Sequence, residues 1–416
     1  MNNIEYKLAS RTAQSDRSSR SSVMMLIATI SVALGLAVMV VTLAVVDGFR
    51  RELYADFRGF AADVRVAHIT SLTDESAAPL PFSGDFLAEV RAMAEVEWVA
   101  PYAEAVVMAR AGDNSLGLKL KGLGADYPME WWQSRLTEGR MPDVGAEERG
   151  REVALSRTTA QRLGVGVGDK LEVLSVEDGQ RPRRNSFRVV GIYHTGLEEM
   201  DSQIAPADVR DVRSALGWSA DEVSGYDVML KESERSTEVA NRIDGRIMDG
   251  RWAEDMTNYL PATLELRYPI VFDWLKAHTV IARSVVIIMM VVLLFNMAAA
   301  VLIMVFDRIG MIGTLKALGM RTSSIRRIFL YRSALLFARG AAWGNAVGLL
   351  LVALQALWEP VRLDPSGYML STLPVSIGWW IVWLNVGVMV VAVGVMVLPS
   401  MAVARISPDE SLKYKL

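Results

Sequence analysis

The chain has 416 residues, of which 52% are hydrophobic and 22% are charged, with a net charge of −3. This composition excludes an ordinary soluble domain, yet it carries too much charge for a protein built only of packed membrane helices. The net charge shows no basic excess of the kind that nucleic acid attracts. The absence of cysteine excludes disulfides and cysteine-based zinc sites, and the three histidines lie far apart in sequence, so we expect no metal site.

Four apolar segments are each long enough to cross a bilayer, for which a helix needs about 20 residues. We predict four transmembrane helices at residues 23–46, 284–306, 333–358 and 375–398. The first segment is too long for the apolar core of a signal peptide and has no small-residue cleavage site, so we expect a retained helix.

Lysine and arginine in the short flanking segments predict the orientation. They are frequent in residues 1–22 and 307–332 and recur in the tail, residues 399–416. Short loops rich in positive charge stay in the cytoplasm. Residues 47–283 and the loop 359–374 are therefore predicted to lie on the outer side.

The outer segment alternates short β-rich runs with amphipathic stretches, which predicts an α+β fold of one domain or two lobes. Glu177-Asp178-Gly179 indicates a hairpin turn, and Gly164 is suited to ending a helix. The predicted strands are 62–68, 105–109, 116–121, 170–175, 186–193 and 226–230. The predicted helices are 84–93, 156–163, 206–216 and 233–248.

Two patterns lie in the C-terminal third. Between the second and third helices, Ile309, Ile312 and Leu315 fall near one face of a short helix that Gly319 can end. In the third helix, Gly340, Gly344 and Gly348 share one face, which favours close approach of another helix. That helix belongs either to this chain or to a second subunit. For the segment from Ile309 to Gly319, the alternative interpretation is a basic loop that only sets the membrane topology.

Several short motifs, together with the order of one helix, a large outer domain and three helices, resemble the LolC/LolE permeases of the MacB/FtsX superfamily. The motifs are Val45-Val46-Asp47-Gly48-Phe49, Leu120-Lys121-Gly122-Leu123, Glu138-Gly139-Arg140, Glu152-Val153-Ala154-Leu155-Ser156, Leu163-Gly164-Val165-Gly166-Val167-Gly168-Asp169 and Val189-Val190-Gly191-Ile192-Tyr193. The resemblance implies an α-helical membrane protein with four transmembrane helices and a large extracytoplasmic α+β domain, the MacB-like periplasmic core domain.

The resemblance also assigns candidate sites. It identifies a coupling helix that docks on the ATPase, where this chain has Met311 at a position that is often acidic in the family. The coupling residues are Arg308, Ile309, Ile312, Gly313, Leu315, Lys316 and Gly319. The candidate lining of a cleft for lipid anchors is Leu43, Val46, Phe49, Val285, Ile288 and Met289, and the candidate carrier contacts after the hairpin turn are Arg181, Pro182, Arg183 and Arg184.

No phosphate-binding loop of the form G-x-x-x-x-G-K-[ST] occurs, so ATP and Mg are expected on a separate subunit and this chain is not expected to be an enzyme. The resemblance implies a permease of the bacterial inner membrane that extracts lipoproteins. Its expected partners are a P-loop ATPase dimer, a second permease of the same or a homologous chain, the lipoprotein substrate, membrane lipid and a periplasmic lipoprotein carrier.

Two other functions remain open from the sequence. One is a MacB-like export permease, which a tripartite efflux adaptor as partner would indicate. The other is an FtsX-like signal transmitter that controls a cell-wall hydrolase. The predicted hairpin is shorter than the carrier-binding hook of LolC-type subunits, which leaves a LolE-like role open.

Overall fold

A computed structural model describes residues 20–72, 79–175, 183–250, 258–363, 370 and 372–400, and the chain divides into two compact units. The helical unit comprises the N-terminal part of the chain up to Arg51, Trp274–Val361 and the part from Leu373 onward. The outer unit comprises Glu52–Asp273 and Arg362–Thr372.

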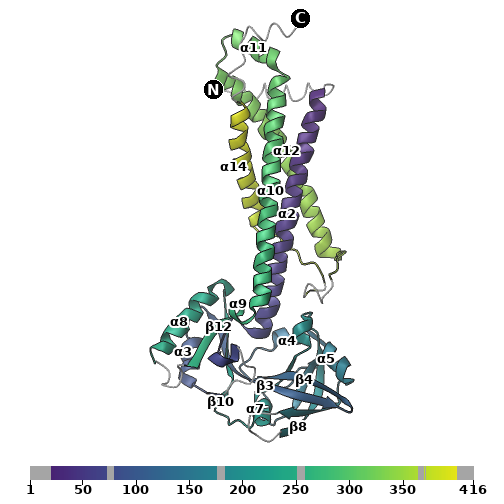
Figure 1. Cartoon of the computed structure of the whole chain (residues 1–416), viewed down its shortest axis with the longest axis vertical. Helices are drawn as coiled ribbons and strands as arrows, with labels where there is room; N and C mark the ends of the chain where they lie inside the picture. The colour runs from purple at the N-terminus through teal and green to yellow at the C-terminus, as the bar shows by residue number, and fades with distance from the viewer. Residues whose placement is uncertain are drawn as a thin grey trace. The chain divides into compact units, whose positions relative to one another are not determined.

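Four helices in the described part of the chain are long and apolar enough to cross a membrane: α2 (Arg20–Ala61), α10 (Pro269–Phe306), α12 (Thr322–Trp358) and α14 (Trp380–Ser400) (Figure 1). The short helix α11 (Ile309–Ala317) connects α10 to α12. Helices α2, α10 and α12 extend well beyond the apolar segments. The last ten residues of α2 belong to the outer unit, because its side chains there, such as Phe57 and Phe60, are buried in that unit.

The prediction that the fourth helix begins at Val375 is wrong, since α14 begins at Trp380. The residues just before it lie outside any helix or strand and contact α2. The Ser376 amide donates a hydrogen bond to the Ala44 carbonyl at 2.9 Å, and its hydroxyl donates to the carboxylate of Asp47. A Cβ on Gly48 would lie 2.6 Å from the Val375 Cα, so Gly48 leaves the space that this segment occupies.

The three glycines of α12 lie against α2 in the helical unit. A Cβ on Gly340 would lie 2.7 Å from Val32 Cβ, one on Gly344 would lie 2.5 Å from the Ala33 carbonyl oxygen, and one on Gly348 would lie 3.2 Å from Val40 Cβ. All three are buried. The helix that approaches them therefore belongs to this chain, and we call this contact the glycine seam.

The outer unit contains two hydrophobic cores that share one long strand, β3 (Val96–Ala111). Its strands form one ten-stranded sheet and one two-stranded sheet. The other strands are β1 (Val64–His68), β2 (Leu80–Pro81), β4 (Asn114–Leu123), β5 (Leu136–Gly139), β6 (Glu152–Ser156), β7 (Lys170–Ser175), β8 (Arg183–Tyr193), β9 (Ile204–Asp208), β10 (Glu222–Val223), β11 (Gly225–Leu230) and β12 (Tyr259–Thr263).

Short helices surround these strands: η1 (Ile69–Leu72), α3 (Gly84–Arg91), α4 (Glu130–Ser134), α5 (Arg157–Leu163), α6 (Glu198–Asp201), α7 (Val209–Leu216), η2 (Ser233–Arg235), α8 (Ser236–Met248) and α9 (Leu264–Arg267). Together the elements form an α+β fold, as predicted. Of the two arrangements left open by the sequence, the chain adopts two lobes around a shared strand.

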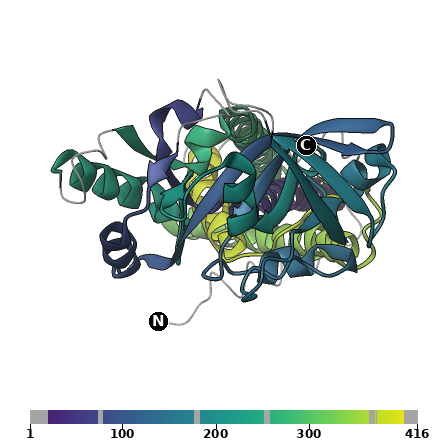
Figure 2. The same cartoon turned by 90° about the horizontal axis from the view of Figure 1, so that it is seen from below.

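One lobe is a closed barrel. Strand β3 pairs with β4, and the pairing continues through β9, β6, β8 and β7 back to β3. Closure leaves these strands no unpaired edge around the ring. Alternate side chains of β3, including Ala105, Val107 and Ala109, are buried in its core. The other lobe is the antiparallel set β12-β1-β11-β3, and both views place α3 and α8 together at its end of the unit (Figures 1 and 2).

Most predicted elements of the outer domain are confirmed, since β7 has the predicted bounds and Gly164 ends α5 at a φ of 69°. The predicted helix at 206–216 begins too early. Residues Ile204–Asp208 form β9, which pairs in parallel with β4, and the Asp208 carboxylate accepts a hydrogen bond from the Arg210 amide as the N-cap of α7. The hairpin turn at 177–179 lies outside the described residues, although β7 and β8 pair as a hairpin requires.

We predict that Gly344→Ala destabilises the helical unit by about 1–3 kcal/mol, because the added methyl group collides with the backbone of α2. Gly394→Ala in α14 is the control, since nothing lies within 4 Å of its added Cβ. Denaturation of the detergent-solubilised protein, followed by circular dichroism, measures both. Equal stability of the two variants would contradict the seam.

Candidate functional site

The predicted coupling residues form α11 and its two ends. Ile312 is 0% exposed and belongs to the core of the helical unit, and Leu315 and Met311 pack partly against the same core. The apolar face that the sequence indicates is therefore covered by this chain itself. Ile312 fixes α11 to the long helices, and Met311 contributes to that packing.

The largest exposed apolar side chain at α11 lies at its C-terminal end. Gly319 adopts a φ of 82°, a left-handed conformation that suits glycine, and it separates α11 from α12 as predicted. Leu318, just before it, is 79% exposed. Arg308 and Lys316 are half-buried, Ile309 is half-buried, and Gly313 is buried. Sequence reasoning did not single out Leu318, because a helix-ending position has no place in an amphipathic pattern.

The candidate cleft residues do not share one environment. Phe49 is 8% exposed and its ring lies 5.6 Å from that of Trp274. Ile288 is exposed, whereas Leu43, Val46, Val285 and Met289 are half-buried. Phe49 therefore packs inside the helical unit, and Ile288 is the residue of this group with the most accessible side chain.

A set of charged side chains, two of them fully buried and two mostly buried, lies where the two lobes of the outer unit meet. We call Arg65, Glu104, Lys121 and Asp227 the buried charge cluster. Lys121 Nζ lies 3.0 Å from Asp227 Oδ2, and both side chains are almost fully buried. Arg65 binds Asp227 with Nε at 2.7 Å from Oδ1 and Glu104 with Nη1 at 2.8 Å from Oε1. The Arg65 guanidinium also stacks 4.0 Å from the ring centre of Tyr102.

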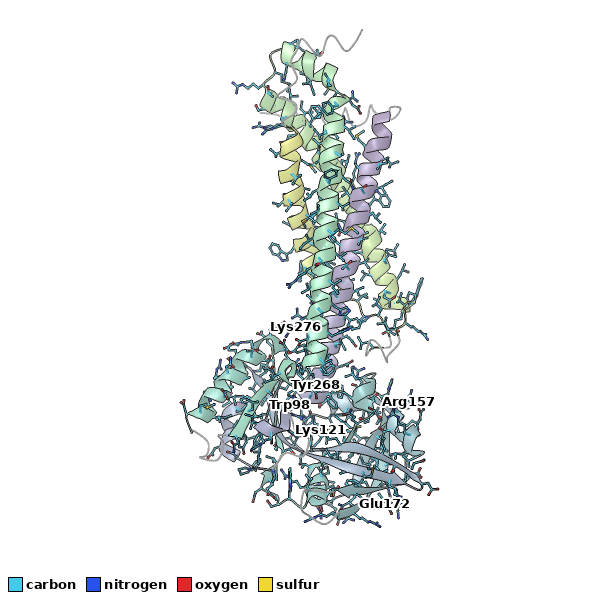
Figure 3. The ribbon with its side chains drawn as sticks, in the orientation of Figure 1. Trp98, Lys121, Arg157, Glu172, Tyr268 and Lys276 are labelled. Atoms are coloured by element: carbon cyan, nitrogen blue, oxygen red, sulfur yellow. The ribbon has the colours of Figure 1, made fainter. Side chains whose placement is uncertain are left out.

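This cluster holds the end of α2. The last carbonyls of a helix have no partner within it, so other groups must satisfy them when the end is buried. Lys121 Nζ donates to the Phe60 carbonyl at 2.7 Å, and Arg267 Nη1 donates to the Ala61 carbonyl at 2.7 Å. Figure 3 labels Lys121 in β4 and Tyr268, the residue that follows Arg267 after α9.

Asp63 makes a second connection just after the helix. Its carboxylate accepts a hydrogen bond from the Leu230 amide at 2.8 Å and one from Arg58 Nε at 2.9 Å. Strand β1 begins at the next residue and pairs with β11 and β12. The final turns of α2 are thus fixed to β4, β11 and α9 of the outer unit by charged groups as well as by packing.

The pKa values in the cluster follow from burial and from the number of opposite charges. Burial lowers the pKa of Lys121 to about 8, although Asp227 lies beside it. Burial alone would raise the pKa of Asp227, but the charges of Arg65 and Lys121 outweigh burial and lower it to about 2. The Asp227 carboxylate is paired with two cations, Arg65 and Lys121, whereas Lys121 has to share that carboxylate with Arg65.

The sequence carries one sign of this cluster. Lys121 and Asp227 each interrupt an apolar strand, and charged residues are almost never fully buried unless they are paired. The pattern marks each residue as unusual but does not identify its partner.

The candidate carrier contacts lie only partly in the described chain. Arg181 and Pro182 lie outside it, whereas Arg183 and Arg184 begin β8 and are exposed. Arg183 also lines a pocket with three other arginines. Among the described residues, no group of three or more His, Cys, Asp or Glu side chains is arranged to hold a metal ion.

Two protein-family models match this chain. The MacB-like periplasmic core domain matches residues 25–246, which is more than half of the chain, and the FtsX-like permease C-terminal domain matches residues 283–408. The chain therefore belongs to the MacB/FtsX superfamily of permeases.

Curated relatives narrow this assignment. The lipoprotein-releasing system transmembrane protein LolC of Xylella fastidiosa is 22% identical, with 93% of this chain and 92% of that protein covered. LolC of Neisseria meningitidis is 24% identical with 92% of each covered, and LolE of Haemophilus influenzae is 21% identical with 92% of each covered. Within the superfamily, the chain is similar to permeases of the LolC/LolE type along nearly its whole length.

A solved structure of the periplasmic region of MacB from Actinobacillus actinomycetemcomitans is 13% identical and has a TM-score of 0.36, with 51% of this chain and 94% of that one covered. The likeness is too slight to carry an argument about the fold.

We predict that acid weakens the contribution of Asp227. Its folded pKa lies below the unfolded value, so its stabilisation of about 2 kcal/mol is present above about pH 4 and is lost as pH falls through about 2. The difference in unfolding free energy between the wild type and Asp227→Asn should shrink by that amount between about pH 5 and about pH 2. Denaturant titration of the full chain measures it.

Asp113→Asn, in the exposed turn between β3 and β4, is the control and should change stability little at either pH. A difference between wild type and Asp227→Asn that stays constant across this range would contradict the ion pairing of Asp227.

Proposed function

We propose that this chain is the permease subunit of an ABC transporter that extracts lipoproteins from the bacterial inner membrane and passes them to a periplasmic carrier. The observation that carries the proposal is the likeness to lipoprotein-releasing permeases along 92–93% of the chain. A separate P-loop ATPase dimer binds ATP and Mg, and a second permease, identical or homologous, completes the membrane part.

The ATPase docks on the segment that contains α11. Two features of this segment support the assignment. Ile312 anchors the helix in the core of the helical unit, so a force applied to α11 reaches the long helices. Leu318 leaves a large apolar side chain exposed at the end of α11, with the positive charge of Lys316 one turn or less away. A large apolar side chain that is this exposed suits a contact with another protein.

The motion then passes along α2. Its contact with α12 is close along the glycine seam, and its final turns are held in the outer unit by Lys121, Arg267 and Asp63. A buried ion pair that is well hydrogen-bonded resists rearrangement, because separating the partners leaves an unpaired buried charge. In this proposal the outer unit moves with the end of α2.

Extraction also needs a place for the acyl chains, since each CH₂ removed from the lipid forfeits about 0.8 kcal/mol. Helix α10 presents an exposed apolar stripe that includes Ile288, the most accessible of the candidate cleft residues. Its members recur at intervals of three or four, which places them on one side of the helix. They are Ile287, Ile288, Val291, Val292 and Phe295. We assign this stripe to the apolar surface that receives the lipid anchor.

We predict that Leu318→Glu weakens binding of the cognate ATPase by about tenfold or more, because it places a charge in an apolar contact. Leu266→Glu is the matched control, since Leu266 is also an exposed leucine but lies in α9 of the outer unit. Co-purification and ATPase stimulation measure binding. Normal assembly of the Leu318→Glu variant would contradict the docking assignment.

The function itself is tested by reconstitution. Proteoliposomes containing the permease, its ATPase and a radiolabelled triacylated lipoprotein should release the lipoprotein to a soluble carrier when ATP is added. Mutation of the ATPase active site is the control. ATP hydrolysis without release would overturn lipoprotein extraction, and binding of an efflux adaptor or a cell-wall hydrolase instead of a carrier would favour one of the two other functions.

A further inference from the structure

The outer unit contains a pocket of about 450 Å³ at the end of α7, a size typical of small-ligand sites. Three of its arginines come from separate parts of the chain: the loop before β6, the start of β8 and the helix α7. The lining residues are Arg149, Arg183, Arg210, Arg213, Ser214, Gly217, Trp218, Ser219 and Ala220. The pocket lies in the barrel lobe, apart from the buried charge cluster, and shares only Arg183 with the candidate carrier contacts.

The arginines differ in how far their charges are compensated. Arg210 is paired, since its Nη2 lies 2.6 Å from Asp208 Oδ2 and its Nε lies 3.0 Å from Asp208 Oδ1. Arg149, Arg183 and Arg213 form no ion pair with any residue in the described part of the chain. Arg213 Nε is buried and has no hydrogen-bond acceptor there. A buried donor without an acceptor is costly, and a ligand is one way to satisfy it.

The Arg183 guanidinium lies over the end of α7, in space that is free because Gly217 has no side chain. Gly217 has a φ of 81°, and a Cβ at this position would lie 2.2 Å from the Arg183 Cζ atom. The glycine thus ends the helix in a left-handed conformation and leaves room for the guanidinium. Burial also lowers the pKa of Arg213, and the carboxylates of Asp221 and Glu222 oppose that effect without forming an ion pair with it in the described part of the chain.

We propose that this pocket binds a phosphate group. A carboxylate has two oxygens and is satisfied by one guanidinium, as Asp208 is by Arg210. The remaining three arginines approach from three chain segments, which suits an anion with three acceptor oxygens and close to two negative charges. The phosphate comes either from a soluble phosphate compound or from a lipid headgroup. This binding site is independent of the cargo that the permease moves.

Isothermal titration calorimetry of the full chain in a non-ionic detergent tests the proposal. Inorganic phosphate is one probe, and dihexanoyl phosphatidic acid, which carries the same group on a glycerolipid, is the other. We expect saturable binding at physiological ionic strength, weakened about tenfold or more in both Arg183→Met and Arg213→Met. Tighter binding of the lipid probe assigns the headgroup as the source, and equal or weaker binding assigns a soluble phosphate.

Arg184→Met is the matched control, because Arg184 is the exposed neighbour of Arg183 on β8 and does not line the pocket. It should change the affinity less than about twofold. Arg183 is exposed, so its variant decides the outcome if Arg213→Met does not fold. Absence of saturable binding in the wild type, equal losses in Arg183→Met and Arg184→Met, or tighter binding of a polyglutamate peptide than of either phosphate probe would overturn the proposal.

Discussion

The contact between the Lys121 amine and the Phe60 carbonyl joins the long N-terminal helix to the outer domain, and the other features depend on it. An amine is stable in this buried position only because Asp227 compensates its charge. Asp227 in turn pairs with Arg65, which binds Glu104 on β3. A chain of charges therefore runs from the end of α2 to the strand that both lobes share. This arrangement holds the last turns of α2 inside the outer unit.

The helical unit is held together by different means. In the helical unit the connection is made by the glycine seam instead of by charged groups. Burying apolar surface gives no advantage over lipid, so helices there associate through close backbone approach. Ile312 fixes α11 to the same core, and Gly48 receives the segment that precedes α14. Each connection that the proposed transmission of motion needs is thus a close packing contact or a buried ion pair within one chain.

The sequence predicted what local patterns determine. Apolar length identified the four long helices, and Gly164 and Gly319 were recognised as helix ends because their conformations are local properties. The closure of β3 on β7 and the pairing of Lys121 with Asp227 join residues far apart along the chain, and no local pattern encodes such a pairing. Ile312 shows that a local pattern also does not reveal what covers an apolar face. Its spacing revealed an apolar face but not that the chain's own helices cover it.

The absence of cysteine in this chain makes site-directed spin labelling direct, and distances between two spin labels test the central claim. One pair, Arg157→Cys with Glu172→Cys, lies within the barrel lobe (Figure 3), and a second pair joins Glu172→Cys to Leu357→Cys at the end of α12. In the assembled transporter, ATP should change the second distance and leave the first unchanged, and Asp227→Ala should uncouple the change from ATP. A second distance that does not respond to ATP, or one that responds equally in Asp227→Ala, would contradict transmission through the buried charge cluster.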